Sequence, residues 1–351
     1  MYKYEIVKFI SNLFDPDFKS EKNSSKFSQN FCDELIRFGS SHLILPSIFA
    51  TLTRKNILHL FPTDLVDYLK EISKINTKRN ELILNQINFI SSLFKRKKIN
   101  HVFLKGSALL ITKPYDVVRE RMIGDIDILV SKKDLYRAEN ILINEGFSGP
   151  SERFLFSEDL LPYNKKHLKR LTHNEFIAAV EIHRRLFDIP SSYLNSSIFL
   201  KNKILTKDGF YTPTMNNIWK HAILNWQYND YGMKFNYLSF RTIIDVIHTE
   251  PRNIKHILKK NIKPINNFYN LLSLHFDYPF NYNFHKLHYI LQLRSYKFYV
   301  FNRLFIKLIV FKSLILTRLK LFIKSKKYRS LIIGNIHLLY MKLIRLWSMI
   351  K

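Results

Sequence analysis

Three acidic residues on two short apolar segments have the spacing that metal-assisted chemistry requires. Asp125 and Asp127 open the run DIDILV, so a strand would place both carboxylates on one face. Such a pair repels unless a cation lies between the two groups, and Mg²⁺ or Mn²⁺ suits hard oxygen ligands. Glu181, in the later run VEIH, offers a third carboxylate, and we interpret His183 on the same face as a hydrogen-bonded structural residue. The pattern predicts a metal site of Asp125, Asp127 and Glu181.

A turn that could hold phosphate precedes these acids. Gly106 and Ser107 follow a short β-prone run, and at a strand-to-helix turn the backbone amides and the serine hydroxyl can bind an anion. Lys105 either contacts the triphosphate or is a lysine whose head reaches solvent from the strand end. Arg121 either pairs with a phosphate or braces the aspartates. With the acids, these are the parts that nucleotidyl transfer from a nucleoside triphosphate requires.

Alternating short strands and helices would position both sets of residues. The expected elements are strands at 101–106, 126–130 and 176–187, and helices from 107 and over 131–147. The third strand is expected to pair with the segment around His167–His173. This order is typical of an α/β or α+β core over residues 99–190. Of the two we expect α+β, with a small mixed sheet between two helical regions.

Helical regions are expected on both sides of that core. Residues 1–98 read as helical, with an interruption around Asn76–Asn80. Residues 191–351 form the second helical region, in which Thr214 could cap a helix that buries Trp219 and Trp226. One further acid, Asp245, interrupts an apolar helical run, so we expect it to be buried and paired with a basic group.

The charge of the chain indicates a phosphate-bearing partner. There are 56 Lys and Arg against 28 Asp and Glu, a formal charge of +28, although AT-rich genomes also favour lysine. Residues 278–351 contain no acid at all, and no uncharged run there is long enough to span a bilayer. A basic amphipathic helix in this tail fits RNA or an anionic membrane surface, and equally a structural bundle with a basic polar face.

The number of cysteines and the first residues of the sequence indicate the cellular compartment to be expected. The single cysteine, Cys32, excludes an internal disulfide framework and a cysteine metal cluster, and we expect no disulfide-linked partner. No secretory signal is recognisable at the start. We expect a cytoplasmic protein, either free or peripheral at the inner membrane surface.

The motifs together resemble those of the polymerase-beta type of nucleotidyltransferase. The order LKG, a tyrosine, an arginine, GDIDILV and VEIH is most similar to a poorly characterised bacterial branch with the pattern KG…Y…R…DxDxLV…(D/E)xHW. Tyr115 and Arg121 stand at the tyrosine and arginine of that pattern, and the resemblance covers about residues 65–250. The chain departs from it in having Glu181 where aspartate is more usual and Arg184 where an aromatic residue is common.

The resemblance implies roles for particular positions. Gly106 and Ser107 would bind the β- and γ-phosphates, and Asp125 and Asp127 would bind the metals. Glu181 would complete the metal site and help to deprotonate the acceptor hydroxyl.

The leading hypothesis is an enzyme that moves a nucleoside monophosphate from an NTP such as ATP to a hydroxyl or phosphate acceptor and releases pyrophosphate. RNA ends, small alcohols and protein side chains are acceptors used across the superfamily. The second hypothesis is a non-catalytic nucleotide-binding protein, which binds RNA or an anionic membrane through its basic tail. The third is a peripheral membrane partner acting in a surface-polysaccharide pathway.

Overall fold

The computed structural model describes most of the chain before residue 277 and part of the basic tail. The described residues are 4–15, 27–149, 166–188, 191–230, 232, 239–260, 262–273, 276, 312, 315–316, 319–320 and 322–334. The chain divides into two compact units. The larger comprises residues 2–233 and 237–282 and contains all the candidate site residues.

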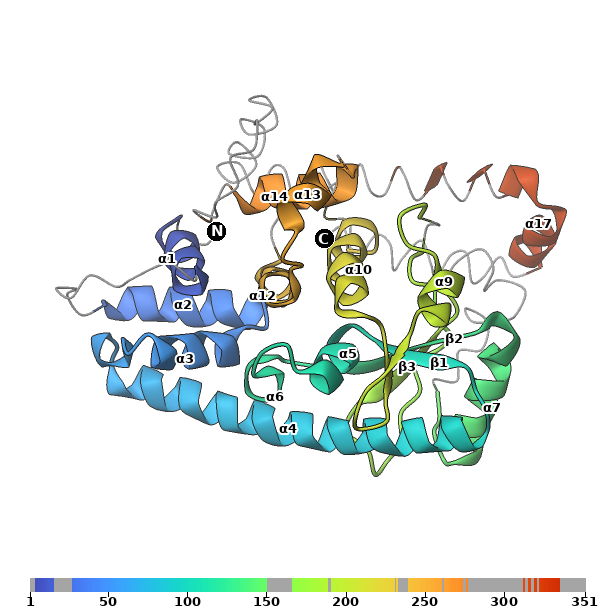
Figure 1. Ribbon diagram of the computed structural model, residues 1–351, viewed down its shortest axis with the longest axis horizontal. Coiled ribbons are helices and arrows are strands. Elements are labelled where there is room, and N and C mark those ends of the chain that lie inside the picture. Colours follow the sequence, from blue (N-terminus) through green and yellow to red (C-terminus); the bar gives the residue numbers. More distant parts are fainter. Residues whose placement is uncertain are drawn as a thin grey trace. The chain divides into compact units, whose positions relative to one another are not determined.

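Helices fill the described part of the first hundred residues. They are α1 (Tyr4–Phe14), α2 (Gln29–Ser41), α3 (Leu45–Arg54), the short 3₁₀ helix η1 (Leu58–Leu60) and α4 (Thr63–Arg96). In Figure 1, α4 runs beneath the other elements of the larger unit, from α2 and α3 at one end to the sheet at the other.

Helix α4 is continuous, which corrects the expected interruption around Asn76–Asn80. Asparagine disfavours helix interiors because its side chain competes for nearby backbone groups. Here both side chains are buried and donate instead to backbone carbonyls of residues 117–121. The two asparagines therefore anchor a neighbouring segment and leave the helix intact.

A three-stranded mixed sheet forms the centre of the larger unit. Its strands are β1 (His101–Leu104), β2 (Asp125–Val130) and β3 (Ala179–His183). β2 lies between the others, antiparallel to β1 and parallel to β3. The bridges His167↔His183 and Leu171↔Val180 continue the sheet into residues 166–172, as expected. The described fold is mostly helical with this small sheet, which confirms the predicted α+β class.

The remaining elements before the third strand pack near the sheet. They are α5 (Lys105–Thr112), α6 (Val117–Glu120), η2 (Lys132–Asp134) and α7 (Leu135–Asn144). Gly146 ends this stretch with a positive φ of 94°, a backbone conformation that glycine adopts without strain.

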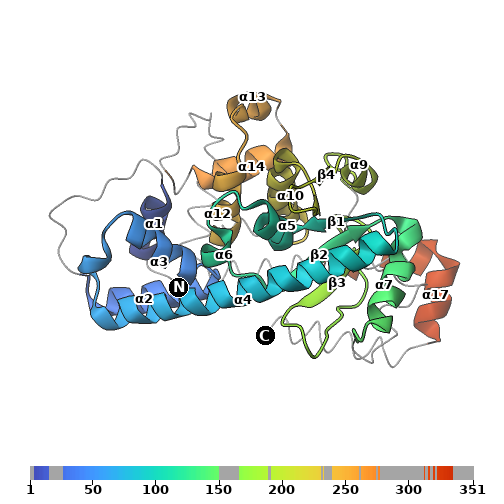
Figure 2. The same ribbon diagram turned by 60° about the horizontal axis from the view of Figure 1, so that its bottom comes forward.

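The two faces of the sheet bury different clusters. Ile126 and Ile128 pack with residues of α4, α5 and α7 on one face, and Figure 2 shows the sheet lying along the later half of α4. On the other face, Leu129 packs with Leu224 and with Phe199. Because side chains alternate along a strand, Asp127 leaves β2 on this second face.

Helices return after the sheet. The elements are α9 (Ser196–Lys201), the hairpin β4 (Ile204–Leu205) and β5 (Tyr211–Thr212), α10 (Met215–Tyr228), α12 (Phe240–Thr249), α13 (Ile254–Lys259) and α14 (Lys263–Leu272). As predicted, the Thr214 side chain caps α10 by accepting from the Asn217 amide, and Trp219 and Trp226 are fully buried.

The basic tail lies mainly outside the described residues, and so does most of its expected amphipathic helix. Within the smaller unit the structure describes α17 (Lys326–Ile333), which Ser325 caps. Among the helices of the described residues, none combines the length and the apolar character that crossing a membrane requires.

A buried ion pair joins the segment before β2 to α12. Arg121 donates from Nε and Nη2 to the two carboxylate oxygens of Asp245 at 2.8 to 3.1 Å, and Tyr115 donates to Asp245 at 2.9 Å. Burial alone would lower the pKa of Arg121, but Asp245 raises it. The expectation that Asp245 is buried and paired with a basic group is confirmed.

Removing this carboxylate should destabilise the larger unit. Asp245→Ala leaves the Arg121 charge buried without its partner, so we expect a loss of about 3–5 kcal/mol in the free energy of unfolding, measured by urea denaturation. Tyr115→Phe, which removes one hydrogen bond, should cost only about 1 kcal/mol.

The matched control replaces both partners. An Arg121→Met, Asp245→Leu double variant buries no unpaired charge and should be more stable than Asp245→Ala. Equal losses in the two variants would mean that the ion pair does not carry the effect.

Candidate functional site

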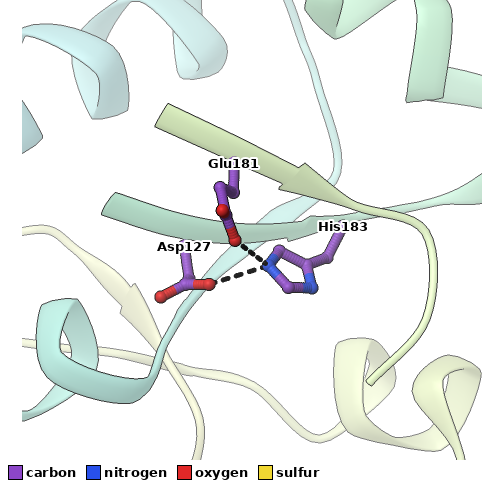
Figure 3. A group of neighbouring side chains, drawn as sticks. All are labelled: Asp127, Glu181 and His183. Carbon is purple, nitrogen blue, oxygen red and sulfur yellow. Dashed lines mark hydrogen bonds and ion pairs between the residues drawn. The ribbon is translucent and has the colours of Figure 1, made fainter. Parts of the chain in front are cut away.

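Two carboxylates and an imidazole meet where β2 and β3 run side by side. Asp127 and Glu181 are directly opposite each other in the parallel register. His183 Nε2 lies 2.8 Å from Asp127 Oδ1 and 3.6 Å from Glu181 Oε2. Figure 3 shows both carboxylates directed at this nitrogen. Since an ionised carboxylate only accepts, His183 donates to Asp127 from Nε2.

A lysine that follows β1, the strand on the other edge of β2 from β3, contacts the same carboxylate. Lys105 Nζ is 2.5 Å from Asp127 Oδ1, and the side chain is only 27% exposed. Lys105 is the first residue after β1, whose last residue, Leu104, is opposite Asp127. The turn from β1 into α5 therefore delivers the ammonium to the carboxylates.

The added edge segment, residues 166–172, contributes further basic groups. Arg170 forms an ion pair with Asp125, and His167 Nε2 lies 3.8 Å from Glu181 Oε2. The Lys166 ammonium is half-buried nearby, and burial, followed by the charge of Lys105, lowers its pKa. The face that carries the acids is thus lined with cations.

Neighbouring charges and burial shift the pKa values of Asp127, Glu181 and His167 from their ordinary values. Burial alone would raise the pKa of Asp127, but Lys105 and the hydrogen bond from His183 hold it well below its usual range. Glu181 behaves similarly: burial opposes ionisation, and the His183 hydrogen bond lowers the pKa. Burial, followed by the charge of His183, lowers the pKa of His167. At neutral pH both carboxylates are ionised.

Gly106 and Ser107 lie at the start of α5, as the strand-to-helix pattern predicts. A side chain at Gly106 would meet the side chain of Ile123 at 3.2 Å, so glycine allows α5 to pack closely against the segment before β2. Ser107 is fully buried, and its hydroxyl has no hydrogen-bond partner in the described part of the chain. A buried hydroxyl without a partner is uncommon in folded proteins, so this one needs an explanation.

The structure separates the sequence-predicted residues into two groups. Asp125, Asp127, Glu181 and Lys105 belong to one network on one face of the sheet. Arg121 does not face the acids, because Asp245 holds it with both carboxylate oxygens. Its hydrogen bonds to carboxylates go to Asp245 and not to Asp125 or Asp127, so it does not brace those two aspartates directly, and its contact with phosphate stays a prediction.

Three further residues contact the acids. His183 is hydrogen-bonded, as the sequence predicts, and its partner is Asp127; the sequence analysis does not single out His167 or Arg170. A signal was present in the sequence. The expected pairing of the 167–173 segment with the third strand already brought a histidine and an arginine next to the carboxylates.

The donor set fits a divalent metal ion. One ligand atom from each of Asp127, Glu181 and His183 lies within 4.8 Å of the others. Two carboxylate oxygens and one imidazole nitrogen are ligands that Mn²⁺ accepts, whereas Mg²⁺ prefers oxygen alone. Asp125 lies two residues before Asp127, on the same face of β2, and forms an ion pair with Arg170.

A mixed sheet with acids beside a strand-to-helix turn is the arrangement that the resemblance to nucleotidyltransferases implied. The chain belongs to a family described as uncharacterised nucleotidyltransferase, whose model matches residues 29–245, more than half of the sequence. This match confirms the resemblance, and it includes every candidate site residue. No curated protein matches the chain.

The two aspartates should differ in what they contribute to the metal-free fold. Asp127→Asn removes the partner of a largely buried lysine and should cost about 2–3 kcal/mol in the free energy of unfolding at pH 7 in EDTA. Asp125→Asn, the matched control, loses a pair whose arginine is half exposed, and should cost at most about 1 kcal/mol.

The pH dependence of that difference follows from the pKa of Asp127. The folded-state pKa lies below the unfolded value of about 3.9, so its contribution is present above that pH and is lost on acidification. The gap between wild type and Asp127→Asn should therefore narrow below about pH 4. A gap that stays constant down to pH 2 would contradict the charge-based explanation.

Proposed function

We propose that the protein transfers a nucleoside monophosphate from an NTP to a hydroxyl or phosphate acceptor and releases pyrophosphate. The observation that supports this best is that Asp127 and Glu181 lie opposite each other on parallel strands, with Lys105 beside Asp127. The chain also belongs to a nucleotidyltransferase family. Mg²⁺ or Mn²⁺ is the cofactor that we propose.

Asp127 and Glu181 would hold the metal, with His183 as a nitrogen ligand or as the donor that orients Asp127. Asp125 would join them from the same face of β2. A divalent ion bound there supplies charge stabilisation at the reacting phosphate. The register of β2 and β3 fixes the spacing of the carboxylates before substrate arrives, which is the kind of preorganisation that lowers a barrier.

The amides at the start of α5 and the Ser107 hydroxyl would bind the terminal phosphates. Lys105 would offset their charge, since its ammonium lies in the same turn. Glu181, partly exposed at the edge of the cluster, is the carboxylate that we assign to accepting the proton of the acceptor hydroxyl.

Transfer can be tested directly with labelled nucleotides. Each α-³²P-labelled NTP is incubated with the full chain, Mg²⁺ or Mn²⁺, and either total RNA or a protein extract. We expect a labelled product and stoichiometric pyrophosphate, and we expect Asp127→Ala or Glu181→Gln to lower the rate by at least about 10²-fold, because each removes charge stabilisation from the transition state.

The matched control is Asp116→Asn, which removes an exposed acid whose ion pair is with Arg119, outside the site. It should transfer at the wild-type rate. No labelled product with any NTP, metal and acceptor pool would overturn the enzymatic proposal.

A second candidate is a nucleotide-binding protein without transfer activity. The observation in its favour is that chain cations already neutralise both aspartates, Lys105 at Asp127 and Arg170 at Asp125. The same experiment separates the candidates: this one retains NTP by filter binding yet yields neither labelled acceptor nor pyrophosphate. Docking on RNA or an anionic membrane would then fall to the tail, outside the described residues.

A further inference from the structure

The acids of the candidate metal site already have cationic partners within the chain. Lys105 Nζ contacts Asp127 Oδ1 at 2.5 Å, and Arg170 forms an ion pair with Asp125. Both partners come from backbone elements that border the acids, the turn after β1 and the edge segment beside β3. A metal ion that binds these carboxylates must therefore compete with groups of the protein itself.

The backbone at Lys105 indicates that this contact is specifically built. Its φ is +49°, in the left-handed region where an L-residue is strained and glycine is not. Such outliers persist where the surrounding structure enforces them and cluster at functional sites. Glycine at this position would relieve the strain, but it has no side chain that could reach Asp127, whereas the lysine ammonium does. The chain thus accepts a strained residue to place an ammonium on this carboxylate.

We propose that Lys105 is an exchangeable counter-ion: it fills the cation position beside Asp127 in the metal-free protein and moves to the phosphate groups when metal and NTP bind. Arg170 has the same relation to Asp125. This inference rests on the proposed function, and it adds the identity of the groups that metal and nucleotide must displace.

The electrostatic reason for the exchange is that a divalent cation at Asp127 repels the adjacent ammonium, whereas a triphosphate attracts it. Lys105 adjoins Gly106 and Ser107, the turn assigned to phosphate, so a rotation of its own side chain is sufficient. Metal alone and nucleotide alone each leave one half of the internal pair without a partner. Metal and nucleotide should therefore each bind weakly when the other is absent. The gain in affinity when both are present should exceed the gain that comes from the metal binding NTP in solution.

The first arm of the test measures Mn²⁺ binding without nucleotide, by electron paramagnetic resonance of free Mn²⁺. Lys105→Met removes the competing charge and keeps a long side chain. We expect its Mn²⁺ affinity to rise roughly tenfold over wild type, since a hydrogen bond to a charged group has about that worth. The affinity for the Mn²⁺–NTP complex should fall in the same variant. A merely structural lysine would not change the two affinities in opposite directions.

The matched control is Lys166→Met. This variant removes a half-buried ammonium of the edge segment 166–172. The structure shows no contact between Lys166 and Asp127. We expect a change of no more than about twofold in Mn²⁺ affinity. An equal rise in both variants would show a general effect of net charge and would overturn the proposal.

The second arm breaks the same pair from the other side. In EDTA, Asp127→Asn frees Lys105 for phosphate, so binding of NTP alone should become several-fold tighter than in wild type. Asp230→Asn is its control, because Asp230 also raises the pKa of Lys105 but makes no ion pair with it in the described structure. It should leave metal-free NTP affinity nearly unchanged.

The outcomes distinguish this inference from the proposed function. Mn²⁺ affinity in Lys105→Met equal to that of wild type, or unchanged NTP affinity in Asp127→Asn, overturns the counter-ion exchange even if transfer is observed. Absence of Mn²⁺ binding in wild type and variant alike, with NTP present as well as without it, overturns both. If Lys105→Met does not fold, Lys105→Gly supplies the same test, because glycine adopts the positive φ without strain.

Discussion

The burial of the ionised Asp127 beside a second, partly exposed carboxylate is the constraint on which the rest of the site depends. Asp127 and Glu181 are opposite each other because β2 and β3 pair in parallel in this register. A buried charge is costly unless it is paired and hydrogen-bonded. Lys105 and His183 meet that requirement at Asp127, and their placement in turn dictates how β1 must end and where β3 must lie.

The same constraint explains the role of helix α4. β2 can hold its acids in place only if the segment that enters it is fixed, and that segment has little regular structure of its own. Asn76, Arg79 and Asn80, three donors on one stretch of α4, bind backbone carbonyls of residues 117–124. The long helix thus holds the backbone of the segment that precedes Asp125. The ion pair of Arg121 with Asp245 connects the same segment to α12.

The sequence predicted the positions of the strands and of the acids better than the groups that pair with those acids. Alternation and the DIDILV and VEIH runs located the strands and three acids, because a period of two residues is a local property. The partners arise from tertiary placement: Arg170 reaches Asp125 only because a bridge at Leu171 extends the sheet beyond β3. Asn76 and Asn80 misled the helix prediction for the same reason, since their acceptors lie some forty residues away.

Internal pairing changes how a carboxylate motif should be interpreted. The affinity of such a site for metal depends on the difference between two interaction energies, that of the carboxylates with the metal and that of the carboxylates with the cation of the protein. The acids alone therefore do not determine the affinity. At Asp127 the supplied cation comes from a residue in a strained backbone conformation, and its side chain is only 27% exposed. Under the proposed exchange, weak binding of free metal is a property of an intact site. Metal affinity measured together with nucleotide is therefore the quantity that tests the proposed transfer.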